Sequence, residues 1–72
     1  MKARIRLDTT GDVTKFVDIT YEIDCPVVIT DNQGLRVNAK SIFGALHAME
    51  FSELWCESEK DIYASIKDFI VE

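Results

Sequence analysis

The sequence predicts an α+β fold, an open-faced sandwich of two layers in which a four-stranded antiparallel sheet is covered on one face by three helices. Two patterns predict it. Short stretches alternate apolar and polar residues, as in strands with one buried face, and longer stretches repeat apolar residues every three or four positions, as in helices. Their order is strand, helix, strand, strand, helix, strand, helix, which leaves the second face of the sheet open to water.

Length and charge limit the classes of function. The 72 residues, 1–72, form a single domain that is too small to hold an elaborate active site beside its core. Thirteen acidic against eight basic residues give a net charge of −5, which opposes nonspecific attraction to nucleic acid and to anionic membranes. We therefore expect a binding module with a protein partner, and neither a nucleic acid partner nor a membrane.

The cysteine content and the absence of long apolar runs bear on the compartment. Cys25 and Cys56 are too few and too far apart for a zinc site, and each is expected to be a small core residue. No apolar run approaches the length of a signal segment or a membrane span. We expect a cytoplasmic protein with reduced cysteines and without a metal or other cofactor.

The first half of the chain predicts one strand, one helix and a hairpin. Residues 3–7 alternate apolar and basic side chains, which is typical of a strand with one buried face. Asp12 is predicted to be the N-cap of a helix that ends near Pro26. Residues 27–30 and 35–37 then form a hairpin around a glycine-containing turn.

The second half predicts a helix, a strand and a final helix. Ser41 lies at or near the N-cap of the first of these helices, which ends near Met49 or Glu50. Its apolar positions suit one helical face and are Ile42, Phe43, Ala45, Leu46 and Met49. Residues 52–57 alternate again, with Trp55 as the unusual member of the outer face.

The final helix is predicted to be the longest. Ser58 and Asp61 have the form of a capping box at its start. Its apolar stripe is Ile62, Tyr63, Ile66, Phe69 and Ile70. The residues expected to be buried in the whole domain are Ile5, Leu7, Phe16, Val27, Ile29, Val37, Leu46, Leu54, Ile62, Ile66 and Phe69.

Residues 37–44 read Val-Asn-Ala-Lys-Ser-Ile-Phe-Gly. This stretch resembles the phosphocarrier protein HPr of the bacterial sugar phosphotransferase system, a family that commonly has the pattern V-x-A-K-S-I-x-G. The apolar pattern of the final helix fits as well, so the resemblance extends over nearly the whole chain, while its specificity lies in about eight residues. The resemblance implies an HPr-like open-faced sandwich of the order βαββαβα.

The chain departs from HPr at the start of the first helix. HPr proteins carry a phosphorylatable histidine there in the pattern G-L-H-A-R-P, whereas residues 7–12 read Leu-Asp-Thr-Thr-Gly-Asp. A phosphohistidine relay needs an imidazole with donors around the phosphoryl group, and nearby carboxylates would repel that group. We therefore expect no phosphocarrier chemistry of the usual kind. Because the sequence also pairs no base with a nucleophile, we expect no catalytic residue and no enzyme activity.

The match at residues 37–44 implies a regulatory role for Ser41. In HPr proteins this serine is modified by HPr kinase/phosphorylase, and the modified form binds a catabolite-control transcription factor. The resemblance thus implies a regulatory module of the phosphotransferase system lineage with Ser41 as its phosphorylation site. Its partner would be a kinase or regulator of HPr type, and the expected protein-binding residues are Lys40, Phe43, His47 and Met49.

Two plainer interpretations stand beside this one. Ser41 could serve only as a helix cap, and the chain could be an HPr-fold interaction or oligomerisation domain with no remaining link to phosphotransfer. His47, the only histidine, is expected to be half exposed, and an ordinary surface residue is the simpler reading than a displaced phosphoryl acceptor.

Overall fold

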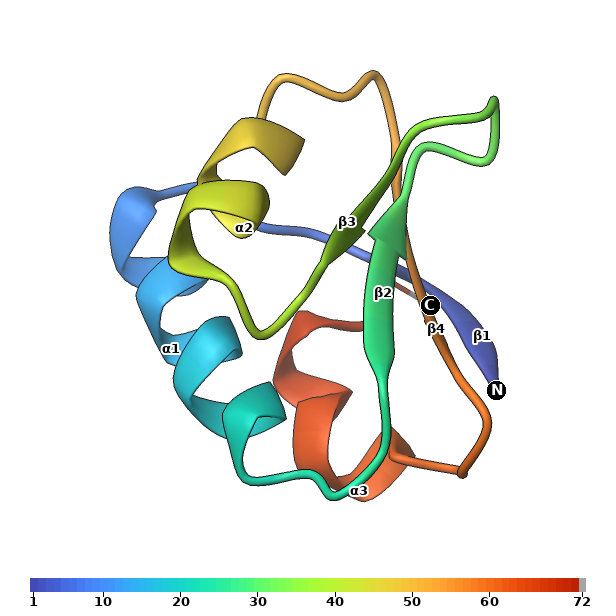
Figure 1. Ribbon diagram of the computed structural model, residues 1–72. Coiled ribbons are helices and arrows are strands. Elements are labelled where there is room, and N and C mark those ends of the chain that lie inside the picture. The colour runs from blue at the N-terminus through green and yellow to red at the C-terminus, as the bar shows by residue number, and fades with distance from the viewer. Residues whose placement is uncertain (72) are drawn as a thin grey trace.

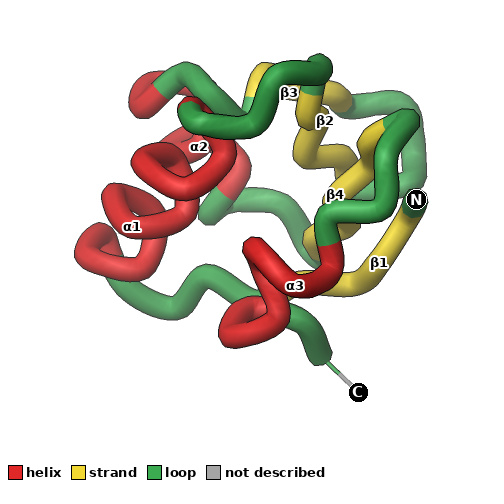
Figure 2. Tube along the Cα trace, turned by 90° about the horizontal axis from the view of Figure 1, so that it is seen from below, coloured by secondary structure: helices red, strands yellow, loops and turns green. Residues whose placement is uncertain are grey.

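The computed structural model describes residues 1–71 and has the predicted α+β architecture, with its helices on one side of the sheet (Figures 1 and 2). The elements in chain order are β1 (Lys2–Ile5), α1 (Thr10–Tyr21), β2 (Val27–Thr30), β3 (Arg36–Asn38), α2 (Ile42–Ala48), β4 (Leu54–Ser58), α3 (Tyr63–Ile66) and the short 3-10 helix η1 (Lys67–Phe69). The four strands lie in the order β1-β4-β2-β3, and all neighbouring pairs are antiparallel. The predicted fold class is confirmed.

The core lies between the sheet and the helices. The register places Ala3 and Ile29 on either side of Cys56, so the inner face of the sheet carries small and β-branched side chains. Both cysteines are free and buried, as predicted. Nine of the eleven residues expected in the core are buried. Val37 and Leu46 are the exceptions, because each packs against the core while part of its side chain stays accessible.

α1 is the longest helix of the described residues and the one that contributes most to the core. Phe16 is fully buried, and its ring meets that of Phe69 edge to face at a centroid distance of 5.2 Å. The helix begins three residues before the predicted position, because Thr9 rather than Asp12 is the N-cap. It ends at Tyr21, before the predicted end near Pro26.

The chain after β4 was predicted as one long helix, and this prediction is wrong. α3 has only four residues and is followed by η1 of three. Ser58 does not cap it, since its hydroxyl donates to the Lys60 carbonyl oxygen at 2.6 Å. The Asp61 carboxylate instead accepts a hydrogen bond from the Tyr63 N–H at 3.0 Å.

The final described residues return to the sheet, which explains the short helix. The Arg6 N–H donates to the Phe69 carbonyl oxygen at 2.8 Å, and the Val71 N–H donates to the Arg4 carbonyl oxygen at 2.9 Å. Between them, Ile70 forms an antiparallel bridge to Ile5. The backbone at Ile70 is extended, with φ −76° and ψ 133°, so the helical spacing of the apolar residues cannot continue there. This segment covers the outer edge of β1.

The predicted hairpin is present between β2 and β3. The Asp31 carboxylate accepts hydrogen bonds from the N–H groups of Gln33 and Leu35, at 2.8 and 3.0 Å. Asn32 and Gly34 have φ of 64° and 111°, values that asparagine and glycine tolerate best.

Within residues 1–71, no helix is long and apolar enough to cross a membrane.

Candidate functional site

The loop between β3 and α2 is shaped by Asn38. Its side-chain oxygen accepts a hydrogen bond from the Lys40 N–H at 2.9 Å, and its main-chain oxygen accepts one from the Ser41 N–H at 3.1 Å. These two bonds turn the chain from the strand into the helix and fix the place of Ser41. The sequence reasoning missed Asn38, although an asparagine just before a helix start is typical of such a turn.

Ser41 is the N-cap of α2, as predicted. Its backbone is extended, with φ −101° and ψ 121°, and its Oγ accepts a hydrogen bond from the Gly44 N–H at 3.3 Å. The first turn of α2 carries no acidic residue. Within residues 1–71, the N–H groups of Ile42 and Phe43 have no acceptor, so the cap satisfies one of the exposed donors at this helix start.

Gly44 allows the helix start to approach β3 closely. A Cβ atom at this position would lie 3.2 Å from the Asn38 main-chain oxygen and 3.4 Å from the Val37 Cβ. The first of these distances is shorter than a Cβ atom normally tolerates, and the contacted atom belongs to the backbone. The glycine at the end of the stretch 37–44 therefore permits close packing.

The same loop is attached to α1 and β2. The Thr20 hydroxyl, which is fully buried, lies 3.1 Å from the carbonyl oxygens of both Val17 and Ala39. The Ala39 N–H donates to the Val27 carbonyl oxygen at 2.9 Å. The Lys40 ammonium donates to the Ile23 carbonyl oxygen near the end of α1. It is therefore held by the segment that follows α1, and within the described residues it makes no hydrogen bond to the Ser41 hydroxyl.

α2 turns small residues to the core and large ones outward. Ala45 and Ala48 are fully buried, whereas 36% of Ile42 and 82% of Phe43 are exposed. The apolar positions that were predicted to share one helical face therefore differ in burial, because Ala45 faces the core whereas Ile42 and Phe43 face outward. Since Gly44 and the two alanines bring the helix close to its neighbours, no room remains beneath it for a phenylalanine ring. Phe43 stands on the surface beside Ser41.

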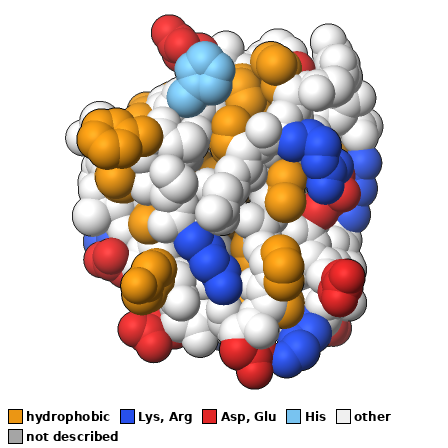
Figure 3. All heavy atoms as spheres, viewed as in Figure 1, with side chains coloured by type: hydrophobic (Ala, Val, Ile, Leu, Met, Phe, Trp, Pro, Cys, Tyr) orange, Lys and Arg blue, Asp and Glu red, His pale blue; other side chains and the backbone are white. Residues whose placement is uncertain are grey.

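His47 lies one helical turn after Phe43, on the exposed side of α2. Its side chain is 60% exposed, its Nδ1 lies 3.5 Å from a Glu50 carboxylate oxygen, and its ring meets that of Phe51 edge to face. Met49 is half buried and packs against the core. Of the four predicted binding residues, Phe43 and His47 share an exposed face, while Lys40 and Met49 are partly enclosed. Figure 3 shows this side of the molecule, with the histidine in pale blue.

The hydrogen-bonding groups at the start of α1 are occupied by the chain's own side chains. The Thr9 Oγ accepts a hydrogen bond from the Asp12 N–H at 3.0 Å. An Asp12 carboxylate oxygen in turn accepts from the N–H groups of Asp8 and Thr9, at 3.0 and 3.3 Å. Asp8 also pairs with the Arg6 guanidinium at 2.8 Å. An anion approaching this helix start meets two carboxylates.

The other residues that could carry chemistry are enclosed or dispersed. Burial raises the pKa of the Cys56 thiol to about 11, so the group stays protonated and a poor nucleophile near neutral pH. Among residues 1–71, no group of three or more histidine, cysteine or acidic side chains is arranged to hold a metal ion.

Comparison of the chain with protein-family models, with curated proteins and with solved structures finds no match.

Proposed function

We propose that the chain is a regulatory protein-binding module that binds a protein partner through the start of α2 and is switched by phosphorylation of Ser41. The observation that carries this proposal is the exposed Phe43 ring, 82% accessible, two residues after a capping hydroxyl. An exposed aromatic side chain offers a partner a large apolar contact. A phosphate beside it adds charge that the partner can read. The proposed lineage is the HPr-like one, without the phosphoryl-accepting histidine, and the proposed compartment is the cytoplasm.

The start of α2 would tolerate the added charge. The first turn has no acidic residue, and the free N–H groups of Ile42 and Phe43 point toward the N-terminal end of the helix. The helix dipole favours a negative group there. The Lys40 ammonium is held by the Ile23 carbonyl oxygen, so the partner rather than this lysine would supply the cation that binds the phosphate.

The modification is tested with HPr kinase and ATP, followed by intact mass measurement. We expect the parent chain to gain one phosphoryl group and Ser41→Ala to gain none. Ser52→Ala, which removes another accessible serine of a neighbouring loop, is the matched control and should be modified like the parent. An unmodified parent chain, or a phosphoryl group on Ser41→Ala, would contradict the regulatory role of Ser41.

The binding surface is tested separately by capture of partners from the source cell extract. Phe43→Ala should abolish capture and change the melting temperature by only a few degrees, since the ring is exposed. Ile19→Ala, at a half-buried position on α1, is a control for a general loss of stability. Capture that survives Phe43→Ala would refute the proposed surface.

The second candidate is an interaction or oligomerisation domain that has lost every link to phosphotransfer. The exposed Phe43 supports it equally, because an apolar contact does not require a modified serine. The two candidates differ in one pair of results. If Phe43→Ala abolishes association while HPr kinase leaves Ser41 unmodified, the second candidate stands and the first fails.

A further inference from the structure

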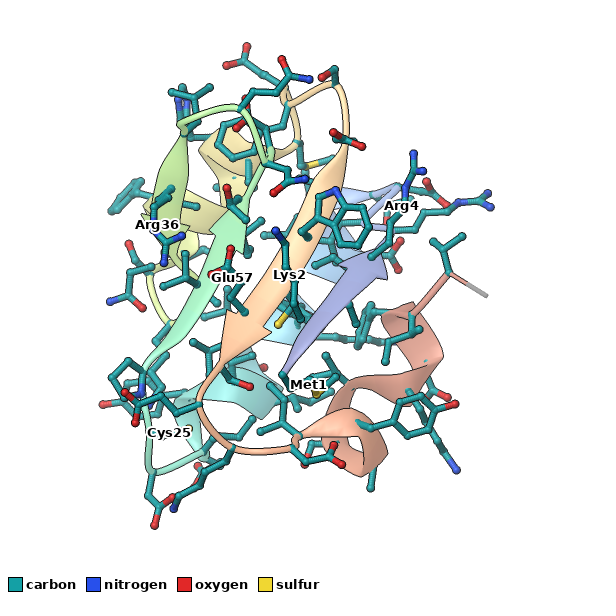
Figure 4. The ribbon with its side chains drawn as sticks, turned by 90° about the vertical axis from the view of Figure 1, so that its right-hand side faces the viewer. Met1, Lys2, Arg4, Cys25, Arg36 and Glu57 are labelled. Carbon is teal, nitrogen blue, oxygen red and sulfur yellow. The ribbon has the colours of Figure 1, made fainter. Side chains whose placement is uncertain are left out.

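The open face of the sheet carries an arrangement of charges that the proposed function does not use. It lies on the side of the sheet away from the helices and is viewed directly in Figure 4. The register of the strands places eight side chains on this sheet face: Lys2 and Arg4 of β1, Trp55 and Glu57 of β4, Val28 and Thr30 of β2, and Arg36 and Asn38 of β3.

The sheet face has the opposite sign to the chain as a whole. Among the paired residues its charged members are Lys2, Arg4 and Arg36 against the carboxylate of Glu57, with Glu59 beside them just beyond β4, whereas the chain carries a net charge of −5. Acidic residues therefore prevail elsewhere on the molecule. A basic area on an acidic protein selects for a partner with local negative charge, since long-range attraction to the whole molecule is absent.

Glu57 holds two of the three cations. Its carboxylate oxygens lie 3.2 and 3.3 Å from an Arg36 guanidinium nitrogen, and one of them lies 3.9 Å from the Lys2 ammonium. Lys2 approaches Glu57 from the neighbouring strand β1, and Arg36 approaches it from β3, across β2 (Figure 4). Arg4 is exposed and, within residues 1–71, makes no side-chain hydrogen bond or ion pair. The face thus has one free cation and two that are bound to an internal carboxylate.

Trp55 gives the face an apolar centre. It pairs with Arg4 on one side and with Thr30 on the other. The Lys2 ammonium lies 5.5 Å from the centroid of the indole ring and also donates to the Asn32 side-chain oxygen. The indole Nε1 is buried and has no hydrogen-bond partner within the described residues. Such a donor gains a hydrogen bond if a ligand brings an acceptor to it.

We propose that the sheet face binds an acidic segment of a protein partner. The carboxylates of this segment pair with Arg4 and Arg36. An apolar side chain or a main-chain carbonyl of the segment covers Trp55. Glu57 then occupies, in the free protein, the place of a partner carboxylate. A protein segment fits better than single-stranded nucleic acid, because the face offers only one aromatic ring among its paired residues, whereas successive bases stack on several. This surface is separate from the start of α2, so the proposal goes beyond the proposed function.

The test uses the emission of Trp55, the only tryptophan of the chain. The full chain is titrated at low ionic strength with a synthetic peptide of glutamates around one leucine. A lysine peptide of the same design and an oligouridylate of matching length serve as comparisons. We expect a saturable change of emission with the glutamate peptide alone, weakened by added salt.

Three substitutions locate the binding. Arg4→Gln and Arg36→Gln should each weaken binding about two- to fivefold, as expected for exposed charge pairs. Glu57→Gln should strengthen binding by a similar factor, because it releases Lys2 and Arg36. Lys15→Gln removes the same charge from the exposed surface of α1 and should leave the affinity unchanged. Far-ultraviolet circular dichroism confirms that each variant is folded.

Four outcomes would overturn the proposal. One is no saturable response to the glutamate peptide, and another is an equal response to the lysine peptide. Tighter binding of oligouridylate would assign the face to nucleic acid. A loss of affinity in Lys15→Gln equal to that in Arg36→Gln would mean that only net charge matters.

Discussion

Thr9 caps α1 and Ser41 caps α2, and each side-chain oxygen accepts a hydrogen bond from the backbone N–H three residues later. At α1 the bond is 3.0 Å long and the Asp12 carboxylate returns two more to the preceding backbone. At α2 the bond is 3.3 Å long and no acidic side chain follows in the first turn. Both helices thus use the same kind of cap, but the start of α1 is occupied by its own carboxylate, whereas the start of α2 remains accessible to an anion.

The two helices also differ in where they place their large side chains. α1 buries Phe16 completely, whereas α2 buries Ala45 and Ala48 and leaves Phe43 on the surface. The difference shows that α1 serves mainly the core, while α2 carries exposed apolar area that the fold itself does not need. Equivalent changes in the two helices should therefore have unequal effects.

The largest effect is expected from truncation of the two phenylalanines. Phe16→Ala should cost about 3–5 kcal/mol of unfolding free energy, because it leaves a cavity beneath α1. This is much of the stability that a domain of this size has, so the variant should be largely unfolded at room temperature. Phe43→Ala should cost less than about 0.5 kcal/mol. Urea denaturation followed by circular dichroism measures both, and similar losses would refute the comparison.

The two glycines in the first turns should respond with opposite signs. Gly11→Ala adds a Cβ atom 3.6 Å from the Thr9 Oγ, an ordinary contact, and should stabilise the protein by about 0.5–1 kcal/mol. Gly44→Ala places a Cβ atom 3.2 Å from the Asn38 main-chain oxygen and should destabilise by about 1 kcal/mol. The measurement is again urea denaturation. If Gly44→Ala stabilises the protein as much as Gly11→Ala does, α2 does not pack as closely against β3 as described.

Removal of the caps should affect α1 more than α2. Thr9→Ala breaks both halves of the capping box, and we expect a loss of about 1–2 kcal/mol. Ser41→Ala removes a single longer bond and should cost about 0.5–1 kcal/mol. Thr14→Ala, at an exposed position of α1, controls for the loss of a hydroxyl from the helix surface. Equal losses for both caps would show that the capping box adds nothing at α1.

The smallest effect is expected when a charge is introduced at the second cap. Ser41→Asp should change the unfolding free energy by less than about 0.5 kcal/mol, since aspartate also caps helices and its charge favours the helix dipole. Thr9→Asp should be destabilising, because it adds a third carboxylate beside Asp8 and Asp12. Thermal melting at low ionic strength distinguishes the two variants. If Ser41→Asp loses as much stability as Thr9→Asp, the proposal that the start of α2 accepts a phosphate is contradicted.

The alternation of apolar and polar residues predicted the sheet and its buried face, because the period of two in a strand is set by backbone geometry alone. The predicted hairpin is present as the antiparallel pair of β2 and β3, whereas an alternating pattern does not report the spatial order of the strands. The final helix was overestimated for a physical reason. Ile62, Ile66 and Phe69 recur at helical spacing, but Ile70 is drawn into an extended bridge with Ile5, a contact far apart in the chain that no local pattern reports.

The cap at Ser41 was predictable, since a serine before an apolar helical pattern favours that position. Helical spacing alone did not predict how exposed Phe43 is, because it grouped Phe43 with Ala45 and Leu46 on one helical face. The spacing identifies which residues share a face, but only the close approach at Gly44 decides which face meets the core. Thr20 was missed because its hydroxyl reaches a carbonyl oxygen of a loop nineteen positions away, at Ala39.

The attachment of that loop to α1 and β2 has a consequence for hydrogen exchange. The Ala39 N–H is bonded to β2 and its carbonyl oxygen to the buried Thr20, so its exchange requires the sheet and α1 to separate. The Phe43 N–H, without an acceptor in residues 1–71, should exchange freely. Protection should therefore fall steeply between Ala39 and Phe43. The first turn of α2 can then rearrange around a partner in a local fluctuation, at little cost to the rest of the domain.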